Sequence, residues 1–168
     1  MLDSEQTKKI KKAVEDFFDK MTIAVSSVEV SSSVSQKGLK GFIDLSGENM
    51  DVVDLDVKTE EPQILIGQQG QTLLEIQRLL KTLLNKKLQK VFYLNLDIND
   101  YKGKKIEYLK HLAKDVADQV SFTKNEKELS PMSSYERRII HAELADRDDI
   151  LTESRGEGFD RHIVVKPK

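Results

Sequence analysis

Arg137 and His141, near the end of the sequence, are separated by one turn of a helix. Residues four apart share a helix face, so the two side chains can reach neighbouring points on one ligand. A guanidinium matches two phosphate oxygens, and a neutral imidazole can stack on a base or donate one hydrogen bond. The pair predicts a binding face for single-stranded nucleic acid. The alternative is a structural pair, in which His141 bonds a backbone carbonyl of the following hairpin and Arg137 pairs with Glu153 or Asp160.

A second candidate site is the turn Gly67-Gln68-Gln69-Gly70, which follows apolar residues 64–66 and opens an amphipathic helix. Glycines let the backbone approach a phosphate, and a helix N-terminus presents unpaired N–H groups and partial positive charge. The spacing alone is a weak signal, because residues 38–41 repeat it among strand-like residues with no helix after them. The alternative is a tight turn that only starts the helix.

Five further cations could extend these sites. Arg78 and Lys81 follow the glycine turn in a stretch, residues 76–105, that holds eight basic and two acidic residues. Arg138 lies beside Arg137 but about 100° around a helix, where it could instead form a salt bridge. Arg155 and Arg161 flank a predicted hairpin turn, and we expect them to extend the Arg137 surface. The alternative for the basic stretch is the solvated face of a helix.

Composition limits the classes of function. The formal net charge is −2 and the sequence pI is near 6.0, so binding to nucleic acid must use local patches. The absence of cysteine excludes disulfides, thiolate metal sites and a cysteine nucleophile, and is compatible with a cytoplasmic location. His141 and His162 have no nucleophile or metal cluster predicted beside them. We therefore expect no catalysis, cofactor, metal, small-molecule substrate or membrane insertion.

Hydrophobic periodicity predicts an α+β chain. In the first half we expect a helix over residues 5–22 with Ser4 or Thr7 as its cap, two or three antiparallel strands between residues 25 and 57, and a strand over 91–98. We expect an additional hairpin over residues 35–50, between the first two strands. In the second half we expect a helix over 106–122, a short strand at 127–129, and a hairpin of strands 150–153 and 162–165. A capping box, Ser133 with Glu136, starts the helix that carries Arg137.

Two parts of the chain resemble known domains in the order of their predicted elements and in their motifs. The helix, strands, Ile-Leu-Ile-Gly-x-x-Gly segment, leucine-rich helix and final strand look like a bacterial, helix-first (type II) K-homology domain. Residues 129–141, 151–158 and 161–165, which read LSPMSSYERRIIH, LTESRGEG and RHIVV, resemble the R-three-H domain of the Jag (SpoIIIJ-associated) proteins. The order of the two domains also matches Jag and covers nearly the whole chain. Jag's small N-terminal domain has no counterpart before the first predicted helix.

The resemblance implies an α+β fold of two small domains. Residues 1–100 would form a type II K-homology-like domain, a three-stranded sheet with helices on one face. Residues 101–168 would form the R-three-H domain with its leading helix, a small sheet packed on helices. In the family, as the resemblance implies, the glycine loop grips nucleic-acid backbone and usually holds a basic residue. Gln68 and Gln69 are neutral here, so we expect this loop to bind more weakly.

The function implied is a cytoplasmic binder of single-stranded RNA, or alternatively of single-stranded DNA. The alternative is a protein-interaction scaffold in cell elongation and division with little RNA binding of its own, its partner a small K-homology protein. The predicted nucleic-acid-binding residues are Gly67, Gln68, Gln69, Gly70, Arg137 and His141, with Arg78, Lys81, Arg138, Arg155 and Arg161 as further candidates.

Overall fold

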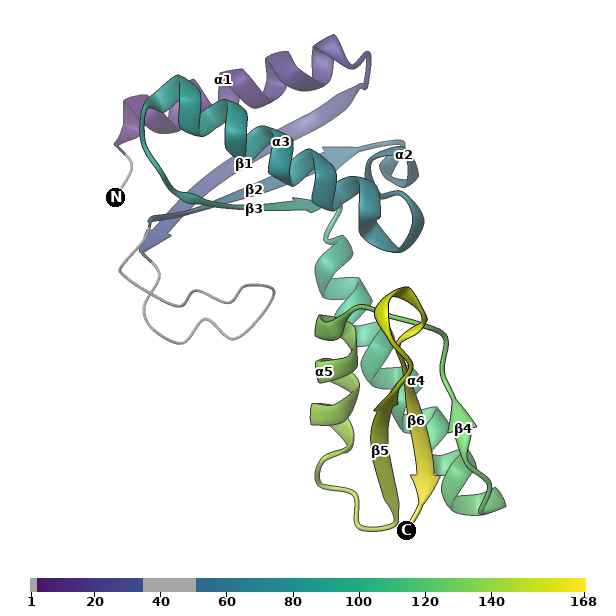
Figure 1. Cartoon of the computed structure of the whole chain (residues 1–168). Coiled ribbons are helices and arrows are strands. Elements are labelled where there is room, and N and C mark those ends of the chain that lie inside the picture. The colour runs from purple at the N-terminus through teal and green to yellow at the C-terminus, as the bar shows by residue number, and fades with distance from the viewer. Residues whose placement is uncertain (1–2, 35–50) are drawn as a thin grey trace. The chain divides into compact units, whose positions relative to one another are not determined.

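The computed structural model describes residues 3–34 and 51–168 (Figure 1). The chain divides into two compact units, Met1–Lys102 (unit 1) and Gly103–Lys168 (unit 2). Each contains one small sheet and the helices packed on it, and the α+β class predicted from the sequence is confirmed. The expected hairpin at residues 35–50 lies outside the described residues.

Unit 1 is a three-stranded mixed sheet in the order β1-β2-β3. β1 and β2 are antiparallel, as predicted, whereas β2 and β3 are parallel. α1 and α3 cover one face of this sheet (Figure 1). In chain order the elements are α1 (Ser4–Lys20), β1 (Val25–Val34), β2 (Asp51–Thr59), α2 (Pro62–Ile66), η1 (Gln68–Gly70), α3 (Gln71–Leu88) and β3 (Tyr93–Ile98).

The core of unit 1 follows from the spacing of apolar residues in the sequence, every second residue in the strands and every third or fourth in the helices. Alternate residues of β2 and β3 point towards the helices, and every third or fourth residue of α1 and α3 points back. These side chains are almost completely removed from water, which is the main stabilisation of the unit. The buried set includes Val53, Leu55, Val57, Leu94, Leu96 and Ile98 from the strands and Ile10, Val14, Phe18, Leu73, Ile76, Leu80 and Leu84 from the helices.

The predicted cap of the first helix is wrong. Asp3, and neither Ser4 nor Thr7, is the N-cap: its carboxylate accepts from the Gln6 N–H at 2.6 Å, and the Gln6 side chain accepts from the Asp3 N–H at 3.3 Å. Periodicity identifies the body of a helix, whereas the cap is chosen by a local reciprocal bond that several neighbouring polar residues could form. The helix ends at Lys20 because Thr22 adopts a positive φ of 58°.

Unit 2 is a three-stranded antiparallel sheet in the order β4-β6-β5, packed on two helices. The predicted hairpin is therefore the larger part of a sheet that β4 completes. The elements are α4 (Tyr101–Thr123), which begins in unit 1, β4 (Lys127–Glu128), α5 (Ser134–Leu144), β5 (Ile150–Arg155), η2 (Gly158–Asp160) and β6 (His162–Pro167). No helix in the described part of the chain combines the length and apolar character needed to cross a bilayer.

The capping box predicted for α5 is confirmed. Ser133 Oγ accepts from the Glu136 N–H at 3.3 Å, and the Glu136 carboxylate accepts from the Ser133 N–H at 2.8 Å. Ile140 and Leu144 then anchor α5 in the core, against Val116 and Val120 of α4 and Ile163 of β6. This anchoring fixes the rotation of α5, and so fixes which of its residues face β5.

Candidate nucleic-acid interface

The face between α5 and β5 brings together the arginine and the histidine singled out in the sequence. His141 Nδ1 lies 2.7 Å from Thr152 Oγ1, and its Nε2 lies 3.0 Å from Ser154 Oγ. Arg137 Nη1 donates to the same Ser154 Oγ at 3.1 Å. We call these four residues the α5–β5 face. The Ser154 hydroxyl therefore helps to position both candidate side chains, Arg137 and His141.

His141 is held as a largely neutral ring. Burial lowers the pKa of His141 below the ordinary value of an imidazole, and the neighbouring Arg137 charge lowers it further. A neutral ring donates through one nitrogen and accepts through the other, and a hydroxyl can take either role. Both hydroxyl contacts are therefore satisfied without a proton on both nitrogens, so Arg137 is the charged member of this face.

Arg137 is a half-buried cation with few partners. Its Nη1 bonds to Ser154, whereas its Nε is shielded from water and has no hydrogen-bond acceptor among the residues that the structure describes. Within those residues, no carboxylate lies within ion-pair distance of its guanidinium. Isolated buried charge is costly, so the arrangement is suited to an anionic group supplied from outside the chain.

The structural alternative for this pair is only partly correct. β5 does hold both side chains, but through hydroxyls rather than through a backbone carbonyl. Glu153, suggested as a partner of Arg137, instead pairs with Lys166 and with Arg155, the latter at 3.3 Å. Successive residues of a strand point to opposite faces, which places Glu153 away from α5.

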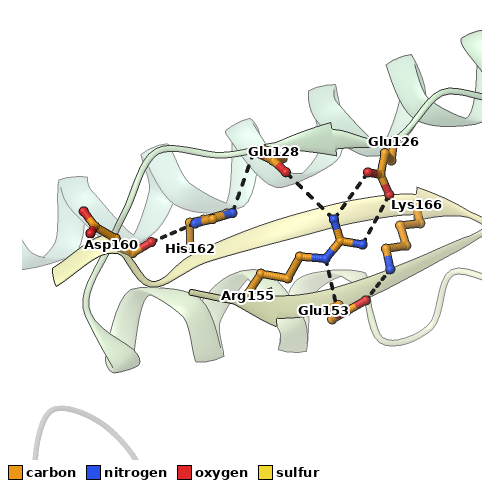
Figure 2. Close-up of polar contacts among 7 residues, drawn as sticks. All are labelled: Glu126, Glu128, Glu153, Arg155, Asp160, His162 and Lys166. Carbon is orange, nitrogen blue, oxygen red and sulfur yellow. Dashed lines mark hydrogen bonds and ion pairs between the residues drawn. The ribbon is translucent and has the colours of Figure 1, made fainter. Parts of the chain in front are cut away.

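Arg155 does not extend the Arg137 surface, so that expectation is wrong. The strand predicted to stop at residue 153 continues to Arg155, and the alternation along β5 turns Arg155 to the side opposite Ser154. There its guanidinium meets three carboxylates, Glu126 and Glu153 at 3.3 Å and Glu128 at 3.8 Å (Figure 2). The hydrogen bond to Glu126 raises the pKa of Arg155. The contacts with Glu126 and Glu128 connect β5 to the β4 segment.

Arg138 and Arg161 are exposed, and neither forms an ion pair within the described ranges. Arg138 follows Arg137 on the outer side of α5. Arg161 lies at the end of the hairpin turn, and its backbone carbonyl accepts from the Met132 N–H at 3.1 Å. Since Met132 precedes the Ser133 cap, this bond fastens the hairpin turn beside the start of α5 (Figure 1). Both arginines remain candidates for the same surface.

The glycine turn of unit 1 is shaped by its own packing. Gly67 has φ 69° and ψ −173°, and a Cβ there would lie 2.0 Å from Thr72 Oγ1. Gly70 has φ 83°, and a Cβ there would lie 3.1 Å from the Tyr101 ring. The steric clash therefore requires glycine at position 67, whereas the positive φ and the close Tyr101 ring favour glycine at position 70, whether or not a ligand binds. Gln68 and Gln69 are exposed at the turn.

The basic residues after this turn have partners within unit 1. Arg78 pairs with Glu75 at 2.9 Å, and Lys81 lies 5.5 Å from the centre of the Tyr93 ring. The sheet face opposite the helices carries neighbouring carboxylates, since Asp56 of β2 is the register partner of Glu29 and of Asp97, although Lys58 and Lys102 lie near Asp56. Carboxylates in adjacent register repel phosphate, so this face is less suited to a nucleic-acid backbone than the α5–β5 face.

Sequence reasoning missed the two hydroxyls that organise the α5–β5 face. Thr152 and Ser154 are common residue types, and nothing in their own chemistry separates them from other polar residues of a strand. The available signal was the period of two, which puts residues 152 and 154 on one side of a strand. The predicted strand ends at residue 153, so this alternation does not extend to Ser154.

Comparison with known proteins first defines the class of unit 2. Residues 107–167 match the family model of the R-three-H domain, so the α5–β5 face belongs to an R-three-H domain. This range includes most of α4, all of α5 and the three strands of unit 2. The R-three-H resemblance stated from the sequence is thereby confirmed.

The relatives then give the family. The chain is 35% identical to a Clostridium symbiosum protein named RNA-binding protein KhpB, over 92% of this chain and 63% of that protein. It is 37% identical to the protein of the same name from Bacillus subtilis (strain 168), over 72% of this chain and 59% of that protein. The Lactiplantibacillus plantarum protein is 33% identical over 79% of this chain and 41% of its own length. Over most of its length the chain is therefore similar to these proteins, which confirms the resemblance to the Jag family stated from the sequence. It spans less than two thirds of the length of each of these relatives.

Proposed function

We propose that this chain is a cytoplasmic single-stranded RNA-binding protein whose principal site is the α5–β5 face. The observation that carries the proposal is Arg137, a half-buried cation oriented by Ser154, for which no described residue supplies a carboxylate. A phosphate of the RNA backbone is the ligand that fits, because the guanidinium fork matches two of its oxygens. The names of the relatives, RNA-binding protein KhpB, support RNA over other anions.

His141 contributes to this site without adding charge. Both ring nitrogens are within hydrogen-bond distance of hydroxyls, so the edge of the ring is occupied by Thr152 and Ser154. What remains for a ligand is the face of the ring, on which a base or a ribose can pack. Stacking is a binding role, and we propose no catalytic step for this chain.

The glycine turn is proposed as a second and weaker contact. We assign residues 1–100 to a type II K-homology-like domain and residues 101–168 to the R-three-H domain with its leading helix. Without a basic residue, Gln68 and Gln69 can offer only neutral hydrogen bonds to a phosphate. Two weak sites on one chain still gain affinity through effective concentration when both engage one strand.

The test is binding of fluorescently labelled single-stranded RNA at low salt, measured by anisotropy. The wild-type chain is expected to bind, and Arg137→Ala/His141→Ala is expected to lose most of this affinity. Arg155→Ala is the matched control, because it removes a guanidinium from the side of β5 opposite to α5. Circular dichroism establishes that each variant is folded. Absence of wild-type binding, or equal binding by the double variant, would contradict the assigned site.

A second candidate function is a protein-interaction scaffold, with a small K-homology protein as partner. It is favoured by exposed apolar side chains in unit 1, among them Ile64 at 58%, Leu79 at 60% and Val91 at 68% exposure. The acidic face of the β1-β2-β3 sheet also favours a protein over RNA there. Affinity purification after nuclease treatment separates the two functions, since only a scaffold retains its partners without RNA.

A further inference from the structure

The tip of the β5–β6 hairpin carries a phenylalanine that the fold leaves entirely in water. Phe159 is 102% exposed, whereas the buried aliphatic residues of unit 2 are at most 8% exposed. Burying a phenylalanine side chain contributes about 1.5–3 kcal/mol to folding, and Phe159 contributes none of this. Packing within the chain therefore does not explain the residue.

The turn that holds Phe159 is braced on both sides of it. The Asp160 N–H donates to the Glu157 carbonyl at 3.1 Å, and His162 Nδ1 donates to the Asp160 carbonyl at 2.8 Å (Figure 2). Gly156, with φ 81°, packs so closely that a Cβ there would lie 2.7 Å from the Asp160 carbonyl oxygen. The aromatic ring thus projects from a closed turn, which lowers the entropy lost when a ligand packs on it.

The same turn is fastened next to the α5–β5 face. The Arg161 carbonyl accepts from the Met132 N–H, immediately before the cap of α5. Phe159 also follows Ser154, the residue that bonds both Arg137 and His141, by only five positions. Five residues span at most about 18 Å when fully extended, so the ring lies within a few nucleotides of the phosphate site.

We propose that Phe159 is a stacking platform for an unpaired base of the RNA strand whose backbone is held at Arg137. The proposal rests on the function proposed above and adds base contact to it. Every base offers a π face, so such a platform tolerates different sequences but requires the base to be unpaired. Arg161, exposed two residues along the chain, is placed to hold the phosphate next to the stacked base. The hairpin tip then selects single strands over duplexes.

Two probes of equal length separate stacking from backbone binding, an octamer of uridylate and an octamer of abasic ribose phosphate. Phe159→Ala is expected to weaken binding of the uridylate at least about fivefold, the lower end for loss of one stacked base. Binding of the abasic octamer is expected to stay at the wild-type level. Phe122→Ala is the matched control, because Phe122 is the other highly exposed phenylalanine of unit 2, at 89%, and lies at the end of α4.

A spectroscopic readout follows from the composition, since the chain has no tryptophan. Phe159→Trp introduces a single indole at the tip, and stacking of a base on it is expected to quench its fluorescence when uridylate is added. The abasic octamer is expected to leave the fluorescence unchanged, as are both octamers with Phe122→Trp.

The outcomes distinguish this proposal from the one on which it rests. If Phe159→Ala binds uridylate like the wild type while Arg137→Ala does not, the platform is wrong and the α5–β5 site stands. Equal weakening towards both octamers also overturns the platform, because it indicates a change of the turn rather than a lost stack. If the wild-type chain binds neither octamer, both proposals fail.

Discussion

The glycine turn of unit 1 and the α5–β5 face of unit 2 are the two candidate binding sites of the chain, but the fold explains their residues to different extents. In the turn, packing against Thr72 and Tyr101 together with positive φ angles explains both glycines, and the two residues between them are neutral. On the α5–β5 face, packing explains how Arg137 is held but not why a cation is there. A motif points to a ligand most strongly where the fold leaves part of its chemistry without an internal partner.

Arg155 makes the same point within a single strand. It is one residue from Ser154, yet its guanidinium is surrounded by Glu126, Glu128 and Glu153 (Figure 2). The guanidiniums of Arg137 and Arg155 lie on opposite sides of β5, and carboxylates surround only that of Arg155. A guanidinium with carboxylate partners ties strands together, whereas one without them can bind an external anion.

The largest effect is expected from closing the space at the glycine turn. Gly67→Ala should lower the free energy of unfolding by about 3 kcal/mol or more, since it adds a steric clash to a backbone region that only glycine adopts readily. Gly158→Ala is the control: φ is also positive there, but no atom lies within 4 Å of the added Cβ. Its cost is expected to be about 1 kcal/mol. Urea denaturation of both variants makes the measurement, and equal costs would show that packing does not hold the Gly67 turn.

Removing the Arg137 side chain should have the next largest effect. Arg137→Ala is expected to weaken binding of single-stranded RNA by about 2 kcal/mol, or about thirtyfold, because a charge-assisted hydrogen bond to phosphate is lost. Arg155→Ala should leave RNA affinity close to wild type but lower the urea midpoint, because it frees three carboxylates from their partner. Anisotropy titrations and urea denaturation of the two variants make the comparison. If the two substitutions affect binding equally, the distinction between these arginines is wrong.

How far the sequence alone could lead differs between these features. The helix bodies, the Ser133 capping box and the Arg137–His141 face follow from periodic spacing, which sequence displays directly. The identity of the first cap does not, because Asp3, Ser4 and Thr7 are all plausible and a single bond to Gln6 decides among them. The side of the sheet on which Arg155 lies is not predictable from spacing alone. The alternation of sides applies to residues 154 and 155 only if the strand extends beyond the predicted end at residue 153.

A charge added to the glycine turn should make it resemble the second site. Gln68→Lys is expected to strengthen RNA binding by about 1 kcal/mol, or about fivefold, if the backbone of the strand passes the turn. The dependence of affinity on salt should steepen by about 0.7 in the log–log slope, as expected for one more neutralised phosphate on a single strand. Thr82→Lys, which adds the same charge about three turns along α3, is the control. Equal gains from both variants would indicate a general charge effect and no contact at the turn.

The smallest effect concerns His141 and depends on pH. Because burial and Arg137 lower the pKa of this imidazole in the folded chain, the unfolded chain takes up a proton more readily. The stability that the neutral ring contributes is therefore complete above the ordinary imidazole pKa, about 6.5, and is lost as the pH falls through the lower folded value. Urea denaturation at about pH 7.5 and about pH 5 should show this loss, and His141→Gln should reduce the difference between the two conditions. His111→Gln, which removes an exposed imidazole from α4, should retain the wild-type difference. An unchanged pH dependence in His141→Gln would mean that the ring is not held neutral by its place beside Arg137, and the assignment of Arg137 as the charged member of the face would need revision.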